Sequence, residues 1–183
     1  MSGDHREVSS MRATAHPVRL QILSLLTGAD MSAAEIAREL DISHANASYH
    51  LRFLADTGLL VEAGEEKIRG GVAKRYRHPW DAGDPQGPRA TDEDRALYIR
   101  AVAEEMVRRF TSRSPGVRTM ITDAEMWVTP EVWAQVKALV EQAAHLVHGE
   151  AQRPRTAGTL HVNMTAATFE MVDPPTSTWA KKS

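Results

Sequence analysis

The chain has 183 residues, 42% of them hydrophobic and 25% charged, an ordinary composition that predicts a soluble globular protein with a real core. The length favours two small domains over one larger one. The formal charge of −2 means that any nucleic-acid surface must be a local basic patch. The absence of cysteine excludes disulfides, cysteine-ligated zinc and thiol nucleophiles. No apolar run is long enough to span a bilayer and no signal-peptide pattern begins the chain, so we expect a cytoplasmic protein with no membrane partner.

Two predicted helices open the chain. Apolar residues recur at helical spacing over residues 7–26, and Pro17 predicts a break or kink within that helix. Ser32 stands three residues before Glu35 in "SAAEIAREL", a capping box in which each side chain satisfies an amide at the helix N-terminus. A short helix with one apolar face therefore follows Ser32.

A third helix is predicted after the turn "DISH", with Ser43 as its N-cap and Gly58 as its stop signal. At about 100° per residue, one side of this helix is apolar and carries Ala47, Leu51 and Leu54. The other side is small or polar and carries Ala45, Ser48, Tyr49 and Arg52, with His44 and Asn46 near the N-terminal end and His50 flanking the apolar stripe. A tight turn before a helix with such a face is typical of insertion into a DNA major groove.

Residues 59–78 predict two strands around a tip that contains Gly70 and Gly71. The tip and the returning strand carry five cationic residues, which are Lys67, Arg69, Lys74, Arg75 and Arg77. Such charges often only solvate a hairpin. Beside a helix-turn-helix, however, they indicate a basic wing that contacts phosphates.

The second half of the chain begins after "WDAGDPQGPRAT", which has the composition of a linker. Helices are predicted over residues 92–111, capped by Thr91 or Asp92, and over residues 130–148, begun by Thr129 and Pro130. Residues 117–128 could form a strand or an irregular pair of strands, and residues 159–172 a strand pair or one long strand. Aromatic and methionine side chains in this half could line a ligand pocket, although core packing is the commoner role for them.

Four segments, "HPVRLQILSLL", "SAAEIARELDIS", "ASYHLRFLADTGLLVE" and "IRGGVAKRYR", resemble successive parts of the winged helix-turn-helix of ArsR/SmtB-type bacterial transcription regulators. The resemblance implies that residues 43–56 are the recognition helix and residues 60–78 the wing. It also implies a dimer that binds a near-palindromic operator, with repression as the usual outcome. Ser48 matches a groove-facing serine of the family motif. His50 also matches that motif, but its flanking angle suits a histidine bonded into the domain interior nearly as well.

The chain departs from the metal-sensing members of this family. The thiol sensors carry cysteines before the recognition turn, where this chain has none. Other members bind zinc through histidines and carboxylates of a C-terminal helix, and Glu141, His145 and His148 share one helix face here. The other half of such a site is missing, and histidines near a helix C-terminus often interact with the helix dipole. We therefore expect no metal.

The sequence thus predicts an α+β fold with a winged helix-turn-helix DNA-binding domain (1–80), a linker (81–90), a mixed helix/strand dimerisation or ligand-sensing region (91–172) and a flexible tail (173–183). The expected partners are double-stranded DNA and a second copy of the chain, with a non-thiol small-molecule effector or none, no cofactor and no catalytic site. A winged-helix module that binds protein and an enzyme with a site in the C-terminal region are the alternatives. The DNA-binding candidates are Ser43, His44, Ala45, Asn46, Ser48, Tyr49, His50, Arg52, Lys67, Arg69, Lys74, Arg75 and Arg77.

Overall fold

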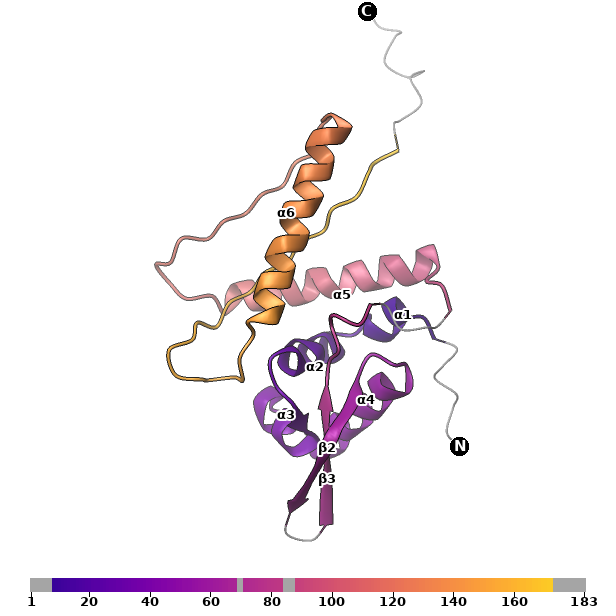
Figure 1. Ribbon diagram of the computed structural model, residues 1–183, viewed down its shortest axis with the longest axis vertical. Helices are drawn as coiled ribbons and strands as arrows, with labels where there is room; N and C mark the ends of the chain where they lie inside the picture. The colour runs from indigo at the N-terminus through magenta and orange to yellow at the C-terminus, as the bar shows by residue number, and fades with distance from the viewer. Residues whose placement is uncertain (1–7, 69–70, 84–87, 173–183) are drawn as a thin grey trace, which may run out of the picture.

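The computed structural model describes residues 8–68, 71–83 and 88–172. In Figure 1 the strands and shorter helices of the first half lie below the longer helices of the second half. The elements in chain order are α1 (Ser10–Thr14), α2 (Pro17–Thr27), β1 (Met31–Ser32), α3 (Ala33–Leu40), α4 (His44–Asp56), β2 (Val61–Ile68), β3 (Gly71–Arg77), α5 (Asp92–Thr111) and α6 (Pro130–Gly149). This is the predicted α+β fold with an N-terminal winged helix-turn-helix. No helix in the described part of the chain combines the length and the apolar character needed to cross a bilayer.

The local signals in the first half are confirmed. The helix predicted over residues 7–26 is broken at Pro17 into α1 and α2, and position 7 lies outside the described residues. Pro17 occupies the first turn of α2, where the missing amide hydrogen costs nothing. Ser32 and Glu35 form the predicted capping box, with Glu35 Oε2 accepting from the Ser32 amide at 2.8 Å.

The sheet has the order β1-β3-β2, with antiparallel pairing throughout. The pairing of β2 with β3 is the predicted hairpin. Its register shifts between Glu62 and Gly64, and Gly64 has a φ of 127°, which a side chain would strain. The two-residue strand β1 pairs Met31 with Tyr76 and was not predicted, because two residues are too few to show a period.

The hydrophobic core lies between α2, α3, α4 and the sheet. Its largest fully buried side chains are Ile22, Leu26, Ile36, Leu51 and Leu54. A buried leucine of this kind contributes about 1.5–3 kcal/mol through the removal of its surface from water. Packing of α4 into this core fixes the orientation of the helix and leaves its other side exposed to solvent.

Helix α5 lies across α1 and α2 and is held there by two buried carboxylates (Figure 1). Near its N-terminus, Asp94 accepts hydrogen bonds from the hydroxyl of Ser9 at 2.9 Å and from Arg12 at 3.2 Å. The pKa of Asp94 is lowered, chiefly by the backbone amide of Thr91 and then by Ser9. Helix α5 therefore packs directly on α1 and α2 of the winged-helix domain.

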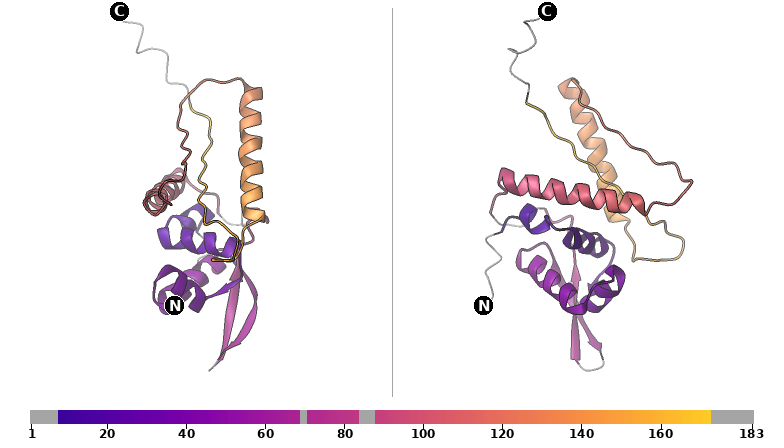
Figure 2. Two further views of the ribbon diagram at one scale, coloured as in Figure 1. Left: turned by 90° about the vertical axis from the view of Figure 1, so that its left-hand side faces the viewer. Right: turned by 180° about the vertical axis from the view of Figure 1, so that it is seen from behind.

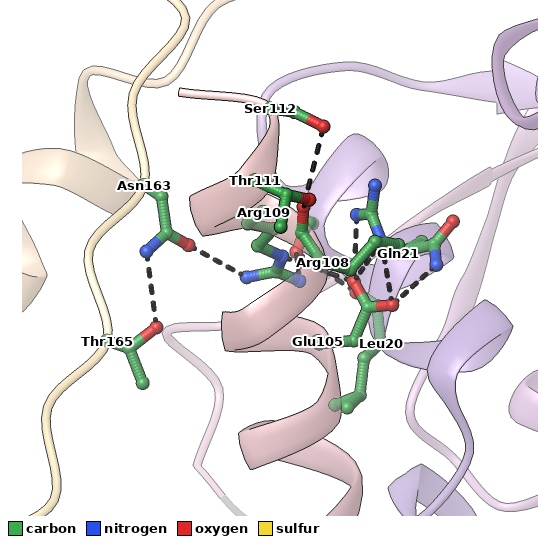
Figure 3. Close-up of polar contacts among 10 residues, drawn as sticks. Leu20, Gln21, Glu105, Arg108, Arg109, Thr111, Ser112, Asn163 and Thr165 are labelled. Atoms are coloured by element: carbon green, nitrogen blue, oxygen red, sulfur yellow. Dashed lines mark hydrogen bonds and ion pairs between the residues drawn. The ribbon is translucent and has the colours of Figure 1, made fainter. Parts of the chain in front are cut away.

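The second carboxylate, Glu105, anchors the other half of α5, as Figure 3 shows. Gln21 of α2 donates to Glu105 Oε1 at 2.7 Å, and Arg108 and Arg109 pair with Glu105 Oε2 at 2.8 and 3.2 Å. Burial raises the pKa of Glu105, but the hydrogen bonds from Arg108 and Gln21 outweigh it and leave the pKa below its ordinary value. Arg109 also donates to Asn163 at 3.1 Å, which ties a distant segment to α5.

The second half differs from the prediction in its strands. Helix α5 has the expected bounds, α6 ends one residue later than expected, and Thr129 caps α6 as predicted. Residues 117–128 and 159–172, all within the described part of the chain, form no strand and run as irregular extended chain (Figure 2). The physical reason is that a strand requires a hydrogen-bonded neighbour, and neither segment has one among the described residues.

The segment after α6 attaches the second half to the winged helix. Arg153 and Arg155 form ion pairs with Glu35 and Glu39 of α3. A Cβ added at Gly28, just after α2, would lie 2.6 Å from the carbonyl oxygen of Gln152, so only glycine fits at that position. The C-terminal end of α6 is therefore held against the helix-turn-helix. The tail predicted over residues 173–183 lies outside the described residues.

Candidate nucleic-acid interface

An N-cap and a row of buried side chains hold α4 in position. The hydroxyl of Ser43 accepts from the amide of Asn46 at 3.2 Å and begins the helix, as predicted. Ala47, Leu51 and Leu54 are fully buried, as the helical spacing predicted. The turn before α4 contains Asp41 in the left-handed conformation at φ 52°, which Asp tolerates better than most residues. The opposite face of α4 must therefore lie at the surface.

That outer face presents most of the predicted recognition residues to solvent. Tyr49 is 54% exposed, and Arg52 is exposed with its Nε donating to the carbonyl of Ser48 at 3.2 Å. Ser48 itself is half-buried. The N-terminal turn is also exposed, at Ser43, His44, Ala45 and Asn46. Together these side chains form a surface that we call the α4 face, defined by residues 43–46, 48, 49 and 52.

His50 does not lie on the α4 face. It is only 6% exposed, and its ring packs 4.9 Å from that of His16 and 5.2 Å from that of Tyr49. Its Nδ1 has no hydrogen-bond partner within the described residues. Burial, with His16 and Arg19 nearby, lowers the pKa of His50 to about 4. His50 is thus an interior side chain packed against His16 and Tyr49, which argues against the predicted DNA contact.

The hairpin of β2 and β3 lies beside α4, and its predicted cations differ in their exposure and in their ion pairing. Lys67, Lys74 and Arg77 are exposed, and Arg69 lies outside the described residues. Lys74 pairs with Glu62 across the hairpin at 2.6 Å, and this hydrogen bond raises its pKa. Part of the positive charge of the wing is therefore neutralised within the hairpin.

Arg75 is turned inward, toward α3. Its guanidinium pairs with Glu35 at 3.0 Å and with Glu66 at 2.7 Å, and it donates to the carbonyl of Asp30. Its side chain is only 19% exposed. Arg75 therefore fastens β3 to the start of the helix-turn-helix, and this engagement argues against the expected phosphate contact. Alternation along a strand could have suggested this, because Lys74 and Arg75 must point to opposite faces.

The sequence did not identify two further cations beside the helix-turn-helix, Arg153 and Arg155. Both are well exposed although each pairs with a glutamate of α3. They lie more than 100 residues from α3 in the chain, and no local pattern signals such a contact.

The three residues weighed as metal ligands do not form a cluster in the structure. No group of three or more potential ligands lies together in the described part of the chain. The rings of His145 and His148 pack against Trp80 at 5.5 and 5.4 Å, and His148 Nδ1 lies 2.7 Å from the carbonyl oxygen of Ala144. Both histidines thus contribute to the contact between α6 and the segment after the wing.

Comparison with known proteins agrees with this geometry. Residues 14–63 match the family model described as a helix-turn-helix domain. A 51-residue stretch is 44% identical to the transcriptional repressor SdpR of Bacillus subtilis (strain 168). That match covers 28% of this chain and 57% of the relative, so the chain spans little more than half the length of the curated protein it resembles.

The N-terminal region is therefore a helix-turn-helix domain of the kind found in DNA-binding transcription regulators. The resemblance to ArsR/SmtB-type regulators is confirmed over that region. The matched family model ends at residue 63, before α5 and α6.

Proposed function

We propose that this protein is a sequence-specific, dimeric transcriptional regulator that acts as a repressor. The observation that carries the proposal is the α4 face, where small and hydrogen-bonding side chains are exposed on a helix whose other side is locked into the core. Bulky apolar side chains would obstruct a major groove, whereas Asn46, Ser48 and Arg52 can hydrogen bond to base edges and phosphates. Repression is supported by the similarity to a transcriptional repressor.

In this proposal the wing supplies affinity and the α4 face supplies specificity. Lys67 and Arg77 are exposed on the hairpin next to α4 and would contact phosphates without reading sequence. Tyr49, Arg52 and the first turn of α4 would contact bases, with about 1–3 kcal/mol of discrimination for each good bidentate contact.

Dimerisation would come from the second half of the chain. A near-palindromic operator requires two recognition helices about one helical turn of DNA apart, related by a two-fold axis. Exposed apolar residues on α5 and α6 offer a surface for that contact. If an effector exists, it acts without thiols and must bind one dimer geometry better than another to release DNA.

One observation favours the protein-binding alternative. Strand β2 is acidic, and Glu62 and Glu66 pair with the cations opposite, so the wing is less basic than its lysines and arginines alone suggest. A winged helix with such a hairpin could bind a protein instead of DNA.

An electrophoretic shift assay on random genomic fragments, followed by selection of the preferred site, separates the two functions. A regulator enriches a near-palindromic sequence and binds it at least about a thousandfold more tightly than bulk DNA at physiological salt. Binding without sequence preference, or no binding, would reject the proposal.

A further inference from the structure

The two extended segments of the second half have the side-chain pattern of strands. In residues 159–172, Leu160, Val162 and Met164 alternate with polar residues, and Phe169 and Met171 repeat the pattern. This period of two is the spacing of one face of a β-strand. The apolar side chains of that row are nevertheless exposed in the single chain. The segment therefore has an alternating apolar face that no described residue of its own chain buries.

The backbone of both segments is also unpaired. No backbone hydrogen bond to another backbone group involves residues 117–128 or 160–172 within the described part of the chain. Extended chain with free amide and carbonyl groups is a template for strand addition.

Helices α5 and α6 leave large apolar faces uncovered beside these segments. Helix α6 has no buried residue, and α5 buries only Asp94, Ala101 and Glu105. The exposed apolar side chains are Ile99, Met106, Val107 and Phe110 on α5, and Val132, Val136, Leu139 and Leu146 on α6. Exposed apolar area of this extent on a folded chain marks an interaction surface.

Polar contacts hold residues 159–172 between the two helices. Asn163 accepts from Arg109 of α5 at 3.1 Å, and Glu170 accepts from the indole of Trp133 of α6 at 2.9 Å. Lys137 of α6 lies 3.9 Å from the same carboxylate of Glu170. Figure 2 shows the segment rising along α6 toward the N-terminal end of that helix. The segment is therefore fixed in place although its backbone is unpaired.

The chain as a whole exposes more surface than a compact monomer of its mass would. The chain exposes 14335 Å², whereas a compact monomer of 20.2 kDa would expose ~8,800 Å². The excess of ~5,500 Å² is more than each subunit loses in an obligate homodimer, where the interface totals about 2,000–5,000 Å² or somewhat more. Among the described residues, the exposed apolar side chains of α5, α6 and the two extended segments are the surface available for such a contact.

We propose that residues 117–128 and 159–172 become strands of an intertwined dimer, in which each segment pairs with a segment of a second copy and the apolar faces of α5 and α6 cover the resulting sheet. This inference rests on the dimer of the proposed function and adds how that dimer is built. A second copy fits because it presents the same two unpaired edges, so one two-fold axis satisfies both at once. Charge does not oppose pairing of residues 159–172 with the same segment of a second copy, since their only carboxylate, Glu170, is already engaged by Trp133 and Lys137.

Amide hydrogen exchange on the full-length protein, with its mass measured by sedimentation, tests this pairing. Paired strands should exchange at least about a hundredfold more slowly over residues 159–172 than an unstructured chain. The protection should disappear on dilution to monomer. Rapid exchange across both segments in a dimer would overturn the strand pairing, and so would a monomer at high micromolar concentration.

Two variants test whether the apolar face of residues 159–172 is the one buried in the dimer. Leu160→Asp places a carboxylate in the alternating apolar row and should raise the dimer dissociation constant at least tenfold. His161→Asp is the control, because the same carboxylate one residue along points to the other face. Equal effects of the two variants would contradict the proposal. Specific DNA binding by wild-type protein whose segments exchange rapidly would overturn this inference alone and leave the proposed function standing.

Discussion

The guanidinium of Arg75 on β3 lies 3.0 Å from the carboxylate of Glu35 on α3, and both side chains are largely buried. Glu35 also caps its own helix through the amide of Ser32 and pairs with Arg153. One carboxylate thus joins the wing, the helix-turn-helix and the segment after α6. Burial alone would raise the pKa of Glu35. Hydrogen bonds from the backbone and side chain of Ser32 and from Arg153, together with the charge of Arg75, outweigh burial and lower this pKa.

Arg75→Ala should destabilise the protein by about 1–3 kcal/mol, because it leaves Glu35 without one partner in a largely buried position. Lys74→Ala is the matched control on the adjacent residue. It breaks an exposed pair with Glu62 and should cost about 0–1 kcal/mol. Urea denaturation measures both values, and equal losses would show that Arg75 has no special structural role.

The two sides of α4 should respond to substitution in opposite ways. Leu51→Ala removes a fully buried side chain and should cost about 2–5 kcal/mol of stability. Tyr49→Ala alters an exposed side chain, so its stability cost should be small while operator binding is impaired. Thermal melting and anisotropy titration, run on both variants, separate these effects. A stable Leu51→Ala protein would mean that the wrong side of α4 has been assigned to the core.

The buried His50 should make stability depend on pH. Its folded pKa of about 4 lies below the ordinary value of 6.5, so the unfolded chain binds the proton first. The neutral folded form is therefore fully favoured above pH 6.5, and stability falls as the pH drops from 6.5 toward 4. His78, with a pKa also lowered to about 4 by burial and by His148, adds to the same trend.

His50→Phe keeps an interior ring but removes the titration, and should reduce the loss of stability between about pH 7 and about pH 5. Urea midpoints of wild type and variant at the two pH values give the comparison. An unchanged pH dependence would assign the whole effect to other groups.

The wing should contribute affinity without sequence preference. Replacing Lys67 and Arg77 with alanine should weaken specific and non-specific binding about equally. It should also reduce the slope of log affinity against log salt by about 1 for each phosphate that the variant no longer neutralises. Lys74→Ala should change the slope less, because Glu62 already pairs with that ammonium. Weaker binding confined to one operator sequence would show instead that the wing reads bases.

Much of the winged helix could be predicted because its signals are local. The break at Pro17, the capping box of Ser32 and Glu35, the start of α4 at Ser43 and the two-strand hairpin all depend on neighbouring residues. The buried and exposed sides of α4 followed from helical spacing in the same way.

What the sequence could not supply depends on contacts between distant residues. The angle of His50 was ambiguous, and only its packing against His16 decided that it is interior. Arg75 resembled the other wing cations until its pairing with Glu35, 40 residues earlier, was visible. The strands expected over residues 117–128 and 159–172 require a pairing partner, and none is present in the part of the chain that the structure describes.

The central claim, that α4 reads DNA sequence, is tested most directly by the affinity of Arg52→Ala for the selected operator and for non-specific DNA at one salt concentration. Arg95→Ala is the control, since it removes the same charge from an exposed position on α5. The account predicts that Arg52→Ala loses about 1–3 kcal/mol on the operator and much less on non-specific DNA, and that Arg95→Ala changes neither. Equal losses on both DNAs, or no loss on the operator, would contradict it.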